Sequence, residues 1–244
     1  MIGDAAIGFR AKTAALAAKD LRIELRGRDT LLPMLIFSIT VVLLLSFALP
    51  ASTGLADPVE LPLGTVPLAD VLAGFLWLTV LFAGLIGFAR TFASENEDGA
   101  LDALLLAPLD RSGLFLAKAV ANLFYVAVTQ AFLFPIAALL FGLQLGGEWL
   151  ALIAIIVLVD LGFSAIGTLF AALAAGTTAR ELILPVLALP ALIPVFIAAV
   201  ELSSSLFTGH SLAELSGSGW FGILIAFDVI FGIVAALAFD FVLD

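Results

Sequence analysis

Two groups of carboxylate side chains in this chain could do chemistry. One group lies in a short polar segment between residues 90 and 111, and the other consists of Asp160 and Asp228, each of which interrupts a long apolar run. An ionised carboxylate at the centre of a bilayer costs roughly 3 kcal/mol on insertion scales. We therefore expect both aspartates to face the interior of a helix bundle. There they would form either a pathway for protons or cargo, or hydrogen bonds between helices.

The segment between residues 90 and 111 has the features of a short helix that lies on a membrane surface. Asp98 is suited to cap its first turn, three leucines share one face, and Pro108 prevents the helix from continuing. Its acidic residues gather near the positive end of the helix dipole. Such a segment is either an inert corner of the chain or a docking element for a cytosolic partner. The residues predicted to form it are Glu95, Glu97, Asp98, Gly99, Leu101, Asp102, Leu104, Leu105 and Pro108.

The residue types present exclude several kinds of active site. The chain contains no cysteine, so thiol chemistry and cysteine-ligated metals are excluded. It contains no Gly-x-x-x-x-Gly-Lys-Ser/Thr loop, so a separate chain would have to hydrolyse any ATP that it uses. A hydrolase within the membrane is disfavoured because the Gly-x-Ser-x-Gly motif is missing and the single His210 lies outside the apolar runs. We expect no catalytic residue and no metal site.

The elements that must position these residues are predicted to be membrane-spanning helices. Hydrophobic residues make up 63% of the 244 residues, and the mean hydropathy is +1.25, far above what one soluble core requires. A helix needs about 20 apolar residues to cross a bilayer. We predict an all-α membrane protein that forms a single domain over residues 1–244. Its six spans are expected at about 31–50, 68–89, 112–142, 149–175, 182–201 and 219–239.

The distribution of basic residues predicts the orientation of these spans. All ten lysines and arginines precede the first span or lie at the second and fourth connections, and the other three connections carry none. Loops rich in lysine and arginine remain on the cytoplasmic side. We therefore expect both termini and the segment at 90–111 to face the cytoplasm of a multi-pass protein of the cell membrane. Lys118, about two turns into the third span, is expected to extend toward the inner headgroups.

Residues 1–29 are predicted to form an amphipathic helix at the membrane surface. Ile7, Ala14, Ala18, Leu21 and Leu25 recur at helical spacing, and the basic residues take the opposite face. The helix could also contact a cytosolic partner. The net charge of the whole chain is −10, which argues against nucleic-acid binding and is typical of proteins from salt-loving organisms.

Two stretches resemble a known family. The run Glu97-Asp-Gly-Ala-Leu-Asp-Ala-Leu-Leu-Leu-Ala-Pro-Leu, followed by Leu116-Ala-Lys, resembles the signature of the CcmB family, the haem exporter protein B family of ABC transporter permeases. Leu189-Pro-Ala-Leu-Ile-Pro-Val-Phe-Ile is similar to a stretch in the family's fifth helix. Asp102 stands where the family has glutamate, and Asp110-Arg-Ser replaces a more apolar run. The number and order of spans match as well.

This resemblance implies a role in the maturation of c-type cytochromes. The segment at 90–111 would be a coupling helix, seated in a groove of a separate ATPase subunit like CcmA. Further partners would be a haem-handling membrane subunit like CcmC, a haem chaperone like CcmE and a second copy of this chain. ATP hydrolysis in the partner would drive haem delivery or the release of the haem-loaded chaperone.

Haem is expected as cargo and not as a bound cofactor. Haem iron is usually held by His, Met, Cys or Tyr. Among these types, the predicted spans contain only Met34 and Tyr125. Two alternatives remain open: an ABC-2 type exporter of lipid or drug without a link to haem, and a proton-coupled carrier that uses Asp160 and Asp228.

Overall fold

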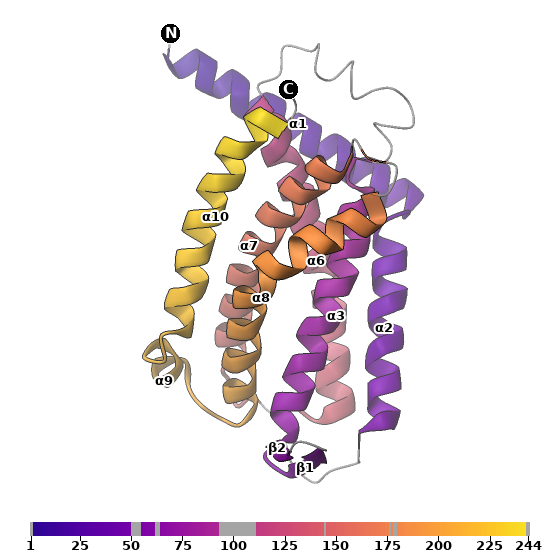
Figure 1. The fold of residues 1–244 in the computed structure, drawn as a ribbon, viewed down its shortest axis with the longest axis vertical. Helices are drawn as coiled ribbons and strands as arrows, with labels where there is room; N and C mark the ends of the chain where they lie inside the picture. The colour runs from indigo at the N-terminus through magenta and orange to yellow at the C-terminus, as the bar shows by residue number, and fades with distance from the viewer. Residues whose placement is uncertain are drawn as a thin grey trace.

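The computed structural model describes residues 2–49, 55–61, 64–92, 111–143, 145–175, 177 and 180–242. Within them, the side chains of residues 2–10, 61, 111, 180, 181, 236 and 239–242 are not described. The elements, labelled as in Figure 1, are α1 (Ile2–Gly27), α2 (Leu31–Ala48), β1 (Pro58–Leu61), β2 (Gly64–Pro67), α3 (Leu68–Arg90), α6 (Arg111–Phe141), α7 (Trp149–Ala175), α8 (Arg180–Phe207), α9 (Leu212–Ser216) and α10 (Trp220–Val242).

The long helices run side by side, and α1 lies across one end of the bundle (Figure 1). The two strands and α9 lie at the opposite end. We call these two ends the α1 end and the hairpin end. α3 ends and α6 begins at the α1 end, so the helix ends that flank residues 93–110 lie close to α1.

Five helices of the described chain are long and apolar enough to cross a membrane: α2, α3, α6, α7 and α8. α2, α3, α6 and α7 begin and end within about two residues of the predicted spans, and α7 begins and ends at the predicted residues 149 and 175. In α10 the stretch whose side chains are described without a gap, Trp220–Ala235, is shorter than the other spans. The sixth span therefore stays a prediction. The all-α class holds apart from one antiparallel hairpin in the described residues, in which Val59 pairs with Val66.

The fifth span was predicted to end near residue 201, and this is wrong. α8 continues to Phe207, because the serines that indicated a loop have partners on α3. The Trp77 indole donates to the Ser203 hydroxyl at 2.9 Å, and the Ser204 hydroxyl donates to the Asp70 carboxylate. Polar side chains that are satisfied across a helix contact do not need to leave the helix.

Reciprocal glycine contacts set the position of the end of α3 against α7. A Cβ atom at Gly84 would lie 2.3 Å from the Phe163 ring, and one at Gly167 would lie 2.1 Å from the Phe88 ring. The two rings pack edge to face with centroids 4.8 Å apart. Small residues that let helices approach closely are the usual basis of helix packing in membranes. These contacts fix the α3 end, which carries the residues described next.

Candidate functional site

The predicted coupling residues themselves lie outside the described residues. They are Glu95, Glu97, Asp98, Gly99, Leu101, Asp102, Leu104, Leu105 and Pro108. The structure does describe both flanks of this segment, which are the end of α3 with Thr91 and Phe92, and the first turns of α6. The candidate site is therefore built from the side chains around these two helix ends.

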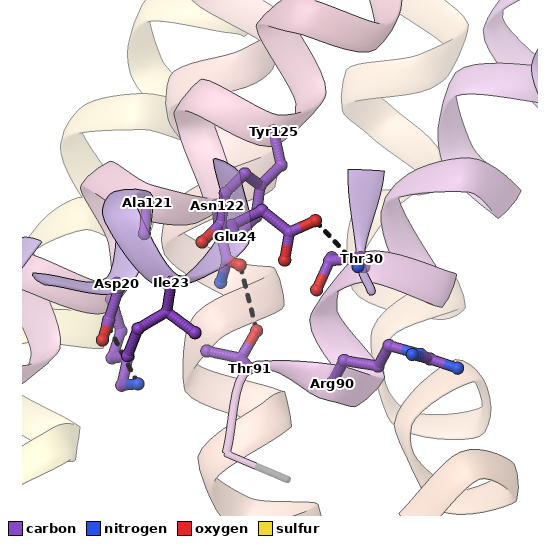
Figure 2. A pocket seen from close by; sticks show the side chains of 11 residues that line it. Asp20, Ile23, Glu24, Thr30, Arg90, Thr91, Ala121, Asn122 and Tyr125 are labelled. Carbon is purple, nitrogen blue, oxygen red and sulfur yellow. Dashed lines mark hydrogen bonds and ion pairs between the residues drawn. The ribbon is translucent and has the colours of Figure 1, made fainter. Parts of the chain in front are cut away.

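A small polar pocket of about 80 Å³ lies there, between α1, α3 and α6. Figure 2 shows side chains from these helices pointing toward one another around it. Four of the lining residues are charged, two acidic and two basic, so their formal charges balance. The lining residues are Asp20, Ile23, Glu24, Thr30, Gly87, Arg90, Thr91, Lys118, Ala121, Asn122 and Tyr125.

Lys118 forms a buried ion pair with α1. Its Nζ lies 3.0 Å from Oδ2 of Asp20 and 5.6 Å from the centroid of the Phe92 ring. Only 4% of Lys118 and 8% of Asp20 are exposed. The structure therefore places the Lys118 ammonium group against α1, buried and paired, and its predicted extension toward the inner headgroups stays a prediction. Desolvating an ammonium group is costly unless it is paired, and α1 brings the pairing carboxylate to it, so the side chain stays inside.

Glu24 of α1 caps the start of α2. Its Oε1 accepts hydrogen bonds from the backbone N–H groups of Thr30 at 2.8 Å and Leu31 at 2.6 Å. The side chain of Thr30, the N-cap residue, makes no capping bond. The first N–H groups of a helix lack partners within the helix, and a negative charge there is favoured by the dipole. Glu24 therefore joins α1 to α2 by satisfying groups that would otherwise be buried without partners.

The turn between α1 and α2 is also held from α3. Nη1 of Arg90 donates to the backbone carbonyl of Asp29 at 2.6 Å. Arg90 is the last residue of α3, and Thr91 and Phe92 follow it. The last residue of α3 is thus bonded directly to the turn that joins α1 to α2.

A chain of hydrogen bonds then leads from the end of α3 into the bundle. The Thr91 hydroxyl donates to Oδ1 of Asn122 on α6 at 3.0 Å, and Nδ2 of Asn122 donates to the Thr168 hydroxyl on α7 at 2.8 Å. Asn122 is 1% and Thr168 0% exposed. We call Thr91, Asn122 and Thr168 the relay. It links α3, α6 and α7 next to the flanks of the predicted coupling segment.

The two aspartates of the apolar runs have different surroundings. Asp160 faces the interior and is 2% exposed, and its Oδ1 accepts a bond of 2.7 Å from Nε2 of Gln130 on α6. Asp228 is half-buried and lies against Gly162 of α7, where a Cβ atom would be 2.5 Å from its Oδ1. Both Asp228 oxygens are buried, and no side chain among the described residues forms a hydrogen bond with them. Asp160 thus bonds to α6, whereas Asp228 packs against α7.

Sequence reasoning missed the polar residues that build the site. Asp20 and Glu24 are spaced four apart on α1 and face the bundle together with Thr13, Leu16 and Ala17. The predicted apolar face is a different one, and its Leu25 is 61% exposed. A signal was present, because Asn122 and Gln130 are amides inside a long apolar run and the acidic pair recurs within a basic helix.

The described residues offer no cluster of three or more His, Cys, Asp or Glu side chains that could hold a metal ion. His210 is exposed at the hairpin end, where its Nδ1 lies 3.0 Å from the Ser205 carbonyl and 3.2 Å from the Thr208 hydroxyl. This setting fits a surface histidine whose ring is held by its own loop.

Comparisons with known proteins agree with the resemblance in the sequence. The family model described as CcmB protein matches residues 11–244. Heme exporter protein B of Rhodobacter capsulatus is 33% identical over 188 residues, which cover 77% of this chain and 80% of that protein. Heme exporter protein B of Bradyrhizobium diazoefficiens is 29% identical over 231 residues, which cover 92% and 94%. The corresponding protein of Paracoccus denitrificans is 30% identical over 187 residues, 77% and 80%. The chain is a multi-pass membrane protein that belongs to the CcmB family.

Proposed function

We propose that this chain is the membrane-spanning permease subunit of an ABC transporter that serves the maturation of c-type cytochromes. In this complex, ATP hydrolysis by a separate subunit drives haem delivery or the release of a haem-loaded chaperone. Membership of the CcmB family and the similarity to proteins named heme exporter protein B support a permease of a haem exporter. The chain itself is non-catalytic in this proposal and carries no phosphate loop.

The relay is the observation that carries the coupling part of the proposal. The ATPase would push on residues 93–110, the segment between α3 and α6. Both flanks of that segment are tied to other helices: Thr91 to α6 and α7 through Asn122, and Lys118 to α1 through Asp20. Packed helices and hydrogen-bond networks transmit displacement as rigid units. A push on the segment would therefore move α3 and α6 together and take α1 with them.

The orientation follows from the basic residues. Among the residues whose side chains are described, every lysine and arginine lies at the α1 end, on α1, the following turn, the end of α3 or the early turns of α6. The positive-inside rule places this end in the cytoplasm, with α10 as the sixth span and both termini inside. The cytoplasmic ATPase would then meet the α1 end, and the hairpin and α9 would face outward.

The complex would contain further subunits. The partners that we propose are an ATPase like CcmA, a haem-handling membrane subunit like CcmC, a chaperone like CcmE and a second copy of this chain. Haem is cargo in this account. Of the described residues that could ligate iron inside the bundle, Met34 and Tyr125 are 1% and 8% exposed and pack in the core. A neighbouring subunit would present the haem.

The proposal can be tested by complementation in the source organism. In a strain without its own copy, the wild-type chain should restore haem attachment to c-type cytochromes, whereas Asp98→Lys should not. Asp98→Asn, which keeps the size of the side chain and some of its capping ability, is the matched control and should restore most of the attachment. Haem attachment that proceeds normally without the chain would contradict the proposal and leave the generic exporter of lipid or drug.

The proton-coupled carrier makes the opposite prediction for the same assay. It requires Asp160 and Asp228 and no ATPase, so Asp160→Asn and Asp228→Asn should abolish transport while Asp98→Lys is tolerated. In the structure Asp160 already has an interhelical bond to Gln130, which an asparagine can keep. We therefore expect Asp160→Asn to retain haem attachment.

A further inference from the structure

A groove of about 640 Å³ opens on the outside of the bundle, near the α1 end. Its walls come from α2, α3 and α8, with Phe37, Phe82, Ile86 and Pro185 among them. Phe82 is 41% exposed, so part of the wall is open to the surrounding membrane. The shape and composition suit an acyl chain, but all lipid-facing surfaces of a membrane protein are apolar, so the apolar wall alone indicates no ligand.

The mouth of the groove carries positive charge. Arg90, the one charged residue among the described residues that line it, is exposed and lies at the α1 end of α3. One of its N–H donors bonds the Asp29 carbonyl at 2.6 Å, which places the turn with Arg28 beside it. Arg28 is exposed, and Arg26, also exposed, lies in the last turn of α1 just before it. Asp29 contributes one carboxylate, so the formal charge of these four residues is +2.

We infer that this groove binds one anionic phospholipid of the leaflet at the α1 end. Its acyl chain would lie along Phe82 and Ile86, and its phosphate would be held by Arg90 and Arg28. Basic pockets between membrane helices on the cytoplasmic side are suited to anionic headgroups. Arginine is also the side chain that matches phosphate oxygens with two parallel donors. The inference does not depend on the proposed ATP coupling.

A second copy of the chain is a less suitable occupant. A two-fold related copy would present the same patch to itself, which would bring two positively charged mouths together at a surface of low dielectric constant. Such like-charge contact is unfavourable. An anionic headgroup instead compensates the charge while its hydrocarbon fills the apolar groove.

The test is native mass spectrometry of the purified full-length chain, delipidated and then titrated with phosphatidylglycerol or with phosphatidylcholine of the same acyl chains. We expect one phosphatidylglycerol to be retained under conditions that remove phosphatidylcholine. Arg90→Gln should lower the retained fraction about tenfold, the effect of one charge-assisted hydrogen bond. Arg90→Lys should restore part of it. Arg22→Gln, which removes the same charge from the exposed face of α1, should change nothing.

Two further measurements test whether the groove holds the acyl chain of the lipid. Ala89→Phe fills the groove wall without changing any charge and should also abolish retention, which keeps the test decisive if Arg90→Gln fails to fold. An excess of inorganic phosphate should not displace the lipid, because it has no acyl chain.

Several outcomes would overturn the inference. They are equal retention of both lipids, equal loss in Arg22→Gln, unchanged retention in Ala89→Phe, displacement by inorganic phosphate, and rapid disulfide formation between two copies of the Ile86→Cys variant. The last result would place a second chain in the groove. Any disulfide between two copies must then join the two introduced cysteines, because the wild-type chain has no cysteine.

Discussion

Three buried ionisable side chains of the described residues have partners on other helices. Lys118 is paired with Asp20 of α1, the carboxylate of Glu24 accepts two N–H bonds from the start of α2, and Asp160 accepts a bond from Gln130. In each case the partner comes from a different helix than the charge. Each contact therefore holds two helices together as well as lowering the cost of desolvation.

Neutralising one member of the Asp20–Lys118 pair should destabilise the chain. Asp20→Asn leaves the Lys118 ammonium group buried without its carboxylate, and removing one partner of such a pair costs about 3 kcal/mol. The measurement is the thermal unfolding midpoint in detergent. The double variant Asp20→Asn/Lys118→Met should recover most of the loss, because no buried charge remains.

Lys19→Met is the matched control for this prediction. Its Nζ lies 3.5 Å from the other oxygen of Asp20, but its side chain is 46% exposed, so its loss should cost less than about 1 kcal/mol. If Asp20→Asn unfolds at the same temperature as Lys19→Met, the buried pair does not hold α1 to the bundle.

The segment around α9, at the hairpin end, offers a test of pH dependence. The backbone N–H of Ser211 donates to Oε2 of Glu214 at 2.9 Å, and this bond holds the pKa of Glu214 below its ordinary value. A lowered pKa in the folded state stabilises the folded state above the unfolded pKa, and the gain is lost as the pH falls through the folded value. Amide exchange in α9, corrected for its intrinsic pH dependence, should therefore speed up on acidification. Glu214→Gln should remove this acid dependence, and its persistence would exclude the bond between Ser211 and Glu214 as the cause.

At the scale of elements, α1 and the turn after it are bonded to three helices, α2, α3 and α6. Asp20 joins it to α6, Glu24 joins it to α2, and the turn that follows is bonded to α3 by Arg90. The basic residues of α1 occupy other faces, so the same helix can lie at the headgroups and still be part of the bundle. A surface helix fixed in this way would move with the spans.

Removing the cap at α2 should weaken the contact between α1 and α2. Glu24→Ala takes away the acceptor for two buried N–H groups and should cost about 1–2 kcal/mol. Glu24→Gln keeps an acceptor oxygen without the charge and should lie between Ala and wild type. The order wild type, Gln, Ala should appear in thermal unfolding midpoints. Equal stability of the Ala and Gln variants would show that the cap does not stabilise α2.

The relay makes a prediction about coupling at the same scale. Asn122→Leu removes both bonds between α3, α6 and α7, while its apolar side chain fits the surrounding core. Haem attachment per molecule of chain in the membrane should fall at least about fivefold, the lower range of allosteric coupling energies, while ATPase association is retained.

Thr79→Val is the control for the relay. Thr79 is buried and lies on α3, like the helix end that leads to the relay. Among the described residues its hydroxyl donates only to the Phe75 carbonyl, which belongs to α3 as well. Its loss should leave haem attachment unchanged. Similar losses in Thr79→Val and Asn122→Leu would mean that general core packing, and not the relay, limits function.

At the scale of the whole molecule, hydropathy predicted the spans well because they are long and uniform. α7 begins at Trp149 and ends at Ala175 as expected, and α3 differs from its predicted span by one residue. The end of α8 was missed because Ser203 and Ser204 look like loop residues in isolation. Their partners on α3 lie more than 120 positions away in the sequence, at a separation of 126 residues for Trp77 and Ser203.

The candidate site was harder to predict for the same reason. Periodicity identified α1 as amphipathic and predicted an apolar face that contains Leu25. The face that is buried against the bundle instead contains Asp20 and Glu24. Those acids are buried because Lys118 and the start of α2 supply the opposite charge and the N–H groups. Pairing of this kind depends on tertiary contacts, which hydrophobic periodicity does not encode. The predicted coupling residues at 95–108 remain a prediction from the sequence.

The central claim is that a separate ATPase docks at residues 93–110, the segment whose flanking helix ends lie at the α1 end. Single-cysteine variants test it directly because the chain has no cysteine of its own. In native membranes, a cysteine-reactive photocrosslinker at Leu101→Cys should capture an ATP-binding ABC subunit, and the same probe at Val59→Cys in the hairpin should not. Capture of the ATPase from the hairpin, or from neither position, would contradict the account.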